Sequence, residues 1–329
     1  MTRIFFLAVL TMTLFACKKQ TTPEALNLQV PKTYSDEYYA NLRAYKKSDH
    51  QICYGWYSDY AQSYSYAQHF AGLPDSIDIV SLWGGIPSLK KDDSLASYNP
   101  VAYNEMREVM KTKGTKMLAV KIIRMEDESW TTLDSAGIIE YGKYLLKMVT
   151  DNDLDGFDMD YEPEGDFLAG NNLTILVKYM GQFLGPKSAN PDKLLVIDYY
   201  SMVPPSDVEP YINYLVNQAY TQGTTTNSAK NLQSRYNLVA GWLSPKKFIV
   251  TENLGDWWQN GGSPFTEANG NTLDADGNQL YSLEGMARWV PTQGPKGGFG
   301  AFYFVRDYNL SPPYKYMRRS IQDANPAVR

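Results

Sequence analysis

Short runs of β-branched or aromatic residues recur along the chain and alternate with longer segments whose apolar residues repeat at helical spacing. The runs that predict strands are residues 51–57, 77–83, 117–123, 155–162, 194–200, 214–220, 247–253 and 298–305. The segments that predict helices are residues 101–114, 136–150, 172–185, 228–243, 283–290 and 312–324. In the second of these helices Ile138, Tyr141 and Leu145 fall on one face, as expected of a helix that packs on a sheet.

Eight predicted strands that alternate with helices over about 280 residues are the pattern of an α/β protein with a (β/α)8 barrel, the TIM barrel. The length of 329 residues suits such a barrel with insertions, and the chain shows no internal repeat. No clear helical pattern follows the first or the fifth predicted strand. A doubly wound parallel sheet, which also alternates strands with helices, is therefore the alternative fold.

The first sixteen residues lie outside this pattern. They combine a basic residue, Arg3, with an apolar run that is short for a bilayer span, so we interpret residues 1–16 as a signal peptide. The motif LFAC, which ends at Cys17, resembles the lipobox of bacterial lipoproteins, and this resemblance implies a lipid on the Cys17 sulfur. A free cysteine after an ordinary signal peptide is the alternative.

Residues 17–44 are mostly polar and contain prolines, which predicts a lipidated N-terminus and a tether, and residues 45–329 form the predicted barrel domain. With Cys17 lipidated, Cys53 is the only remaining thiol, so no intrachain disulfide is predicted. We expect a monomer that is anchored in the cell envelope, at the surface of the outer membrane. Its contact with the membrane is expected to be made only through the lipid.

Composition narrows the class of protein. A hydrophobic content of 43% with 20% charged residues predicts a globular domain with a substantial core. The net charge of −5 and the lack of a long basic run argue against a nucleic-acid partner. The 26 tyrosines and 7 tryptophans supply many flat amphipathic rings, which serve as core residues and also stack on the C–H faces of sugars.

An acidic segment, DNDLDGFDMDYEPEG at residues 151–165, places six carboxylates within twelve residues. Counted from Asp151, its spacing is D-x-D-x-D-G-x5-E, the pattern of a calcium-binding EF-hand loop. The helix that must leave such a loop is blocked by Pro163 and Gly165. No second hand is visible, since Asp276-Gly277 predicts a hairpin turn instead. We therefore do not interpret the segment as a calcium loop.

The same residues read as a strand place Asp158, Asp160 and Glu162 on one face, because side chains alternate along a strand. In a TIM barrel this face points into the lumen near the carboxyl end of the strand, where such barrels carry out their chemistry. Crowded buried carboxylates repel one another, so at least one holds its proton near neutral pH and is available as a general acid. An exposed acidic edge strand is the structural alternative.

The motif DGFDMDYE, from Asp155 to Glu162, resembles the D-x-x-D-x-D-x-E signature of glycoside hydrolase family 18. The resemblance covers roughly residues 45–329 and implies a TIM barrel. The family includes chitinases, endo-β-N-acetylglucosaminidases that cut N-glycans, and sugar-binding relatives without the catalytic acid. The chain lacks the S-x-G-G that chitinases carry on the third strand. Its sixth predicted strand ends in Gln218-Ala219-Tyr220, a Q-x-Y similar to the endo-β-N-acetylglucosaminidase branch.

This resemblance implies a retaining, substrate-assisted hydrolysis of the GlcNAc-β-1,4-GlcNAc core of N-glycans, with no metal and no organic cofactor. Glu162 would protonate the leaving oxygen and later activate water, while the substrate acetamido carbonyl attacks its own anomeric carbon to form an oxazolinium ion. Asp160 would accept the acetamido N–H, and Asp158 would share a proton with Asp160. Gln218 and Tyr220 would hold the acetamido carbonyl in line. Tyr220 as an ordinary barrel aromatic is the alternative.

Aromatic residues near the ends of the predicted strands are candidates for the sugar-binding walls. These candidates are Trp83, Tyr199, Tyr200, Trp257, Trp258 and Tyr303. The eighth strand lacks the tryptophan that the family commonly places under the reacting sugar, and residues 260–281 are expected to form a loop over the barrel mouth. The expected partner is an N-glycan or another GlcNAc-containing glycan. A chitinase-type hydrolase and a non-catalytic glycan-binding protein are the alternatives, although the presence of Glu162 argues against the latter.

The lipid-anchored, aromatic-rich form of the chain further resembles the cell-surface endoglycosidases of gut and oral Bacteroidetes. Asp155 and Gly156, which open the acidic strand, are expected to shape the start of that strand and not to touch substrate.

Overall fold

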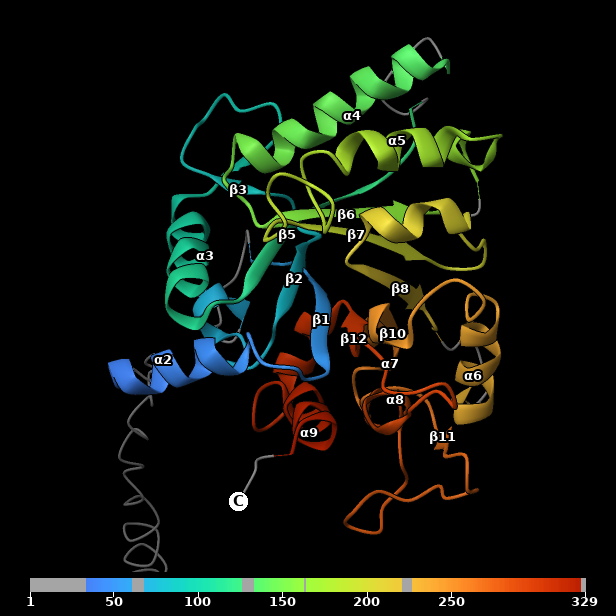
Figure 1. The fold of residues 1–329 in the computed structure, drawn as a ribbon. Helices are drawn as coiled ribbons and strands as arrows, with labels where there is room; N and C mark the ends of the chain where they lie inside the picture. The colour runs from blue at the N-terminus through green and yellow to red at the C-terminus, as the bar shows by residue number, and fades with distance from the viewer. Residues whose placement is uncertain (1–33, 61–67, 126–132, 163, 221–226, 327–329) are drawn as a thin grey trace, which may run out of the picture. The chain divides into compact units, whose positions relative to one another are not determined.

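A computed structural model describes residues 34–60, 68–125, 133–162, 164–220 and 227–326. Eight strands form a closed barrel in the order β1-β12-β10-β8-β7-β6-β5-β2, and every pair of neighbours is parallel. The first and last of these strands close the ring, so the blue β1 and the red β12 lie side by side in Figure 1. The predicted (β/α)8 barrel is confirmed, and the doubly wound sheet is excluded.

The barrel strands coincide with the eight predicted runs to within a few residues. They are β1 (Ile52–Tyr57), β2 (Ile79–Leu82), β5 (Lys116–Ile122), β6 (Gly156–Tyr161), β7 (Leu194–Tyr199), β8 (Tyr214–Gln218), β10 (Phe248–Asn253) and β12 (Gly298–Phe302). Two small parallel pairs lie outside the barrel: β3 (Pro87–Ser88) with β4 (Ser97–Tyr98), and β9 (Asn227–Ser228) with β11 (Phe265–Thr266).

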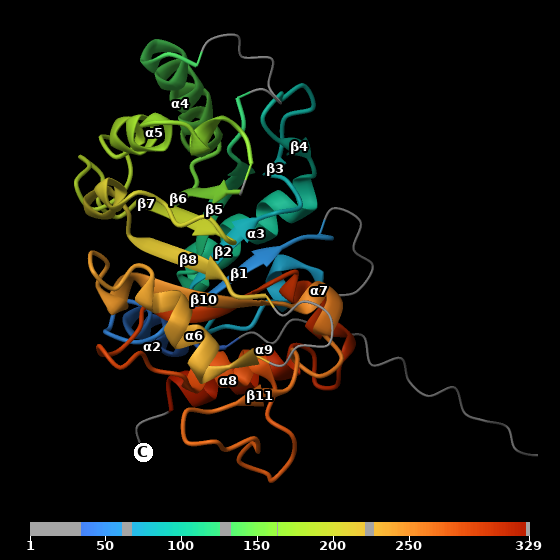
Figure 2. The same ribbon diagram turned by 90° about the vertical axis from the view of Figure 1, so that its right-hand side faces the viewer.

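Helices surround the barrel on the sides seen in Figures 1 and 2. They are α3 (Pro100–Lys113), α4 (Ser135–Thr150), α5 (Asn172–Met180), α6 (Ala229–Asn237), α7 (Leu254–Trp257), α8 (Ser282–Arg288) and α9 (Lys315–Ala324). In the described part of the chain only 3-10 turns, η3 (Phe70–Gly72) and η6 (Ser206–Tyr211), fill the connections after β1 and β7. This explains why the sequence shows no helical pattern after the first and fifth strands.

The ends of α3 illustrate how local sequence sets these boundaries. Asn99 precedes the helix and its side chain accepts the backbone N–H of Ala102, while Pro100 occupies the first helical position, where no N–H is needed. Gly114 follows the last turn at φ 70°, a left-handed conformation that glycine adopts without a steric penalty. The helix therefore begins and ends within one residue of the predicted segment.

The apolar core has two layers. One layer fills the barrel lumen and consists of Tyr54, Trp56, Ile79, Leu118, Val196, Val216 and Ile249, with further residues packed at its edge. The other, larger layer lies between the strands and the helices and includes Phe157, Met159, Ile197 and Tyr199. Alternate residues of each strand thus belong to different layers, and this alternation decides which side chains of β6 and β7 reach the lumen.

Residues 36–44, which the sequence analysis assigns to the tether, belong instead to a helix, α2 (Asp36–Tyr45). The Ser35 side chain caps its first turn, Arg43 donates to the Thr112 carbonyl, and Leu42 is buried. Lys46, just after the helix, donates to the Ile77 carbonyl at 2.5 Å, so this segment packs where β2 begins. No helix within the described ranges is long and apolar enough to cross a membrane.

Candidate active site

The acidic face of β6 points into the barrel, as the strand interpretation predicts. Asp158 lies in register between Val120 of β5 and Val196 of β7, both of which belong to or pack against the lumen layer. Exposure increases toward the carboxyl end: Asp158 is 0% exposed, Asp160 is 4% exposed, and Glu162 is partly exposed. The last acid is therefore the one that a substrate at the mouth would meet first. The calcium-loop interpretation is excluded, because residues 156–161 are a strand.

Asp155 and Gly156 lie at the opposite end of β6. The Asp155 carboxylate accepts the Met117 backbone N–H at 3.0 Å and the Lys116 ammonium at 3.1 Å. A Cβ on Gly156 would stand 2.1 Å from the carbonyl oxygen of Leu194, so only glycine permits this close approach of β6 to β7. Both residues set the start of the strand, as expected, and neither lies at the mouth.

Three side-chain donors converge on one oxygen of Asp158. Asp158 Oδ2 accepts from the Tyr54 hydroxyl at 2.6 Å, the Ser81 hydroxyl at 2.7 Å and the Trp56 indole N–H at 3.0 Å. These donors stand on β1 and β2. Burial raises the pKa of Asp158, and the donors oppose that rise by stabilising the carboxylate.

A fourth acid, which the sequence analysis does not identify, joins the cluster. Asp198 of β7 is fully buried and is the cross-strand partner of Asp160. The side-chain amide of Gln218 on β8 donates to Oδ1 of Asp160 at 3.2 Å and also to Oδ1 of Asp198. Both amide N–H groups of Gln218 are therefore occupied by carboxyls in this structure.

Burial first, and then the charges of neighbouring acids, raise the pKa values in this cluster. Burial, followed by the charges of Glu162 and Asp158, raises the pKa of Asp160 to about 7. Burial, followed by the charges of Asp160 and Asp158, raises the pKa of Asp198 well above its usual range. Burial and the charge of Asp198 likewise raise the pKa of Tyr220, which keeps its phenol neutral and able to donate a hydrogen bond. The charges of neighbouring carboxylates thus add to the effect of burial at Asp160 and Asp198.

An aromatic group lies beside the acids, at the carboxyl end of β12. The Phe302 ring is 5.4 Å from Trp83, 5.9 Å from Tyr220 and 6.2 Å from Trp56, measured between centroids. Tyr303, the next residue, is 5.0 Å from Phe302 and has the left-handed backbone that turns the chain away from the strand. The structure therefore brings Trp83, Tyr220 and Tyr303 together around Phe302, which occupies the end of the eighth strand where the sequence shows no tryptophan.

The structure does not bring Tyr199 to this site. Tyr199 is 1% exposed and belongs to the layer between strands and helices, because it follows Asp198 by one residue and so points to the opposite side of β7. Tyr200 follows β7 and is partly exposed. Trp257 ends α7, directly after β10, and Trp258 packs against the outer layer.

Residues 260–281, which are expected to form a loop over the mouth, contain β11 and a hairpin. The predicted hairpin is present, since Leu273 bridges Gln279 and Gly277 has φ 81°. The Arg319 guanidinium of α9 ties this hairpin down through Asp274 at 3.0 Å and Asp276 at 3.1 Å. The hairpin is thus held against α9. The start of the segment lies at the barrel, because Ser263 contacts Ser282, whose hydroxyl donates to Glu252 of β10. The expected position over the mouth stays a prediction.

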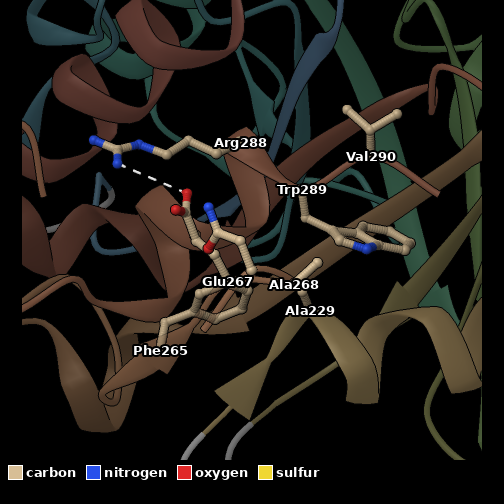
Figure 3. Close-up of a pocket in the computed structure, with 9 residues that line it drawn as sticks. Ala229, Phe265, Glu267, Ala268, Arg288, Trp289 and Val290 are labelled. Atoms are coloured by element: carbon tan, nitrogen blue, oxygen red, sulfur yellow. Dashed lines mark ion pairs between the residues drawn. The ribbon is translucent and has the colours of Figure 1, made fainter. Parts of the chain in front are cut away.

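A cavity of about 260 Å³ lies apart from the acid cluster, between α6, β11 and α8. Its lining residues are Ala229, Phe265, Glu267, Ala268, Asn269, Gly285, Arg288, Trp289 and Val290, most of which Figure 3 labels. Arg288 is held by Asp323 at 2.8 Å and by Glu284, with Glu267 at 3.9 Å, so its charge is already neutralised. The cavity shares no residue with the acid cluster and offers no comparable group of acids.

Comparison with known proteins agrees with this geometry. Residues 18–322 match the sequence model of glycoside hydrolase family 18, BT1044-like. Endo-beta-N-acetylglucosaminidase F2 of Elizabethkingia meningoseptica is 29% identical over 326 residues, which cover 93% of this chain and 90% of that relative.

Solved structures show the same fold. A variant of BT1044 superimposes with a TM-score of 0.72 at 21% identity and covers 88% of this chain and 93% of that chain. A mutant of the endo-beta-N-acetylglucosaminidase of Cordyceps militaris, in complex with fucosyl-N-acetylglucosamine-Asn, superimposes with a TM-score of 0.67 at 22% identity, covering 90% and 98%.

A TIM barrel with three inward-facing acids at the end of its fourth strand is the architecture of a glycoside hydrolase. The family match spans most of the chain, and the chain belongs to glycoside hydrolase family 18, in its BT1044-like group. The family resemblance that the D-x-x-D-x-D-x-E motif indicated is thereby confirmed.

Proposed function

We propose that this glycoside hydrolase is an endo-β-N-acetylglucosaminidase that cleaves the GlcNAc-β-1,4-GlcNAc core of N-glycans. The relative from Elizabethkingia meningoseptica carries that activity in its name, and the Cordyceps militaris structure binds a GlcNAc still attached to Asn. The observation that carries the proposal is the graded burial of Asp158, Asp160 and Glu162 on one face of β6, with Tyr220 beside them.

Each site residue has a role in the substrate-assisted mechanism that the family resemblance implies. Glu162, the outermost acid, protonates the leaving oxygen while the acetamido carbonyl of the substrate attacks the anomeric carbon. Asp160, as a carboxylate, accepts the acetamido N–H and offsets the positive charge of the oxazolinium ion. Tyr220 donates to the acetamido oxygen and holds it in line, and Glu162 then activates the water that opens the ring.

Gln218 also orients the acids, because its side-chain amide donates to both Asp160 and Asp198. Its role in holding the acetamido carbonyl beside Tyr220, which the resemblance implies, stays a prediction.

A substrate panel tests the proposal. The enzyme is incubated with a high-mannose glycoprotein, a complex-type glycoprotein and chitin oligomers, beside a Glu162→Gln variant. Release of intact glycan that leaves one GlcNAc on the protein, and its loss in the variant, supports the proposal. Cleavage of chitin oligomers alone would show a chitinase, and binding without cleavage a glycan-capturing protein.

We further propose that the enzyme is attached to the cell envelope through a lipid on Cys17. The LFAC motif and the polar residues 18–33 that follow it support this proposal, and both lie outside the described residues. A monomer on the surface of the outer membrane suits an enzyme that meets external glycoproteins. A Cys17→Ala variant should move from the membrane fraction to the soluble fraction with its specific activity retained, and persistence in the membrane fraction would contradict the anchor.

A further inference from the structure

Two buried oxygens in the acid cluster accept no hydrogen bond from the described residues. They are Asp158 Oδ1 and Asp198 Oδ2. The other oxygen of each acid is well occupied: Asp158 Oδ2 has three donors on β1 and β2, and Asp198 Oδ1 has Gln218. Buried polar atoms are rarely left unpaired, so these two need an explanation.

The two carboxyls lie within hydrogen-bonding reach of each other, so a single proton between them would give both acids a partner. The position of that proton follows from the donors, because three donors on Asp158 Oδ2 stabilise the ionised form of Asp158. Asp198 has one neutral donor and full burial, which favours its uncharged form.

We propose that Asp198 is the protonated member of the cluster and a positioning residue of the reaction, which donates to Asp158 and leaves Asp160 free to act as a carboxylate. The inference rests on the proposed function, since Asp160 is the group that meets the substrate. The family resemblance makes Asp158 and Asp160 share a proton, whereas here Asp198 provides the proton for Asp158. Asp198 touches no substrate atom and acts through Asp160 and Gln218.

The charged and titratable groups around Asp198 agree with this assignment. Asp158 and Asp160 face it from β6, Tyr54 from β1, and Tyr220 from the end of β8. Within the described residues no Lys, Arg or His contributes to the pKa of Asp198 among its leading causes. Burial raises the pKa of Asp198 first, and the charges of Asp160 and Asp158 and the hydrogen bond with Asp158 raise it further, while Gln218 opposes the rise. Hydrogen bonds with Asp198 lower the pKa of both Asp158 and Asp160, as expected if Asp198 carries the proton.

Two substitutions of Asp198 are expected to differ in their effect on activity. Asp198→Asn keeps an uncharged group that donates and accepts, whereas Asp198→Ala removes the donor to Asp158 and the acceptor of Gln218. We expect the Asn variant to lose about threefold in kcat and the Ala variant about 100-fold, with little change in KM for either. If both variants lose activity equally, Asp198 acts as an anion and the proposal is overturned.

The pH profile provides a readout that a purely structural role would not move. Because Asp198 is already uncharged, Asp198→Asn should leave the acidic limb of kcat/KM in place. Asp158→Asn removes a real negative charge beside Asp160 and should move that limb to lower pH by about one unit. A shift of this size in the Asp198→Asn variant would mean that Asp198 is ionised, contrary to the proposal.

Infrared difference spectroscopy tests the protonation independently of catalysis and of the Ala variant. At about pH 8, above the pKa of Asp160, the spectrum of the full-length protein minus that of Asp198→Asn should show the C=O stretch of one protonated carboxylic acid. Absence of that band refutes the proposal. If the wild-type enzyme cleaves no N-glycan but the band is present, the proposed function fails while the protonation of Asp198 is upheld.

Discussion

Asp160 and Asp198 are direct partners across the β6–β7 pair, and the one side-chain amide of Gln218 donates to both. Three neighbouring strands of the barrel are thereby joined through two carboxyls that stand next to the proposed reaction centre. The charge of Asp160 raises the pKa of Asp198, whereas a hydrogen bond with Asp198 lowers the pKa of Asp160, so a change in the charge of one acid alters the proton affinity of the other.

Glu162→Gln should lower kcat by a factor of about 10² to 10⁴, because the amide has the shape of the acid but no proton to deliver. Binding of an uncleaved glycopeptide should persist, since the side chain keeps its volume. The measurement is single-turnover cleavage together with calorimetric binding on the same preparation.

Glu164→Gln is the matched control for that variant. Glu164 lies two residues further on, its side chain is 72% exposed, and it pairs with Arg124 at 2.7 Å. An exposed ion pair of this kind contributes little, so activity should remain within about twofold of the wild type. Equal losses in the two variants would show that general loss of acidity, and not proton delivery by Glu162, explains the effect.

Stability should depend on pH through Asp160. Its pKa is raised to about 7 in the folded protein, against about 3.9 for an unfolded Asp. Between these values the folded state binds more protons than the unfolded state, so the free energy of unfolding decreases as pH rises, by at most about 1.4 kcal/mol per pH unit. The contribution of the protonated Asp160 to the free energy of unfolding is fully present below about pH 4 and is lost above about pH 7.

Asp160→Asn removes this titration. We expect the variant and the wild type to be equally stable near pH 4. As the pH rises to about 7, the free energy of unfolding of the variant should come to exceed that of the wild type by about 1–3 kcal/mol, and its melting temperature should be higher accordingly. Thermal unfolding over a pH series measures the difference. Asp207→Asn, which removes a side chain that is 65% exposed, should show no such trend, and a flat difference for Asp160→Asn would refute the burial argument.

The fold was predictable because its signals are local. Each barrel strand is a short apolar run, and the caps of α3 mark its ends within a few residues. Only Leu42 of α2 is buried, so the sequence of this helix is mostly polar. It therefore shows no apolar repeat at helical spacing that would predict a helix. Its packing depends on contacts with Thr112 and Ile77, which sequence order alone does not reveal.

The site was predictable only along β6. The partners of Asp158 come from 77 to 104 residues away, and their meeting depends on how the barrel closes. The position of Asp198 could have been recognised from the sequence. It is the one acid within the apolar run LLVIDYY, and an acid in a buried strand indicates a functional site. Period two then excludes Tyr199, which must point to the other side of the strand.

Tyr220→Phe should lower kcat by about 10- to 100-fold with a smaller effect on KM, since the phenol positions the acetamido oxygen while the ring maintains its contact with Phe302. Tyr199→Phe is the control, because Tyr199 is buried in the layer between strands and helices, on the side of β7 that faces away from the acids. The measurement is kcat and KM of both variants and the wild type on the same glycoprotein substrate. Loss of activity in the Tyr199 variant would restore it as a site residue.

Phe302→Ala should raise KM by about tenfold and lower kcat less, because Phe302 is the ring around which Trp56, Trp83 and Tyr220 are arranged. Phe302→Trp keeps an aromatic surface at the end of β12 and should recover most of the lost affinity. Phe183→Ala, at an aromatic side chain that is 42% exposed beyond α5, controls for loss of a ring elsewhere. If Phe302→Ala binds a non-cleaved glycopeptide as tightly as the wild type, the sugar-binding floor lies on another residue, and Trp83 becomes the next candidate.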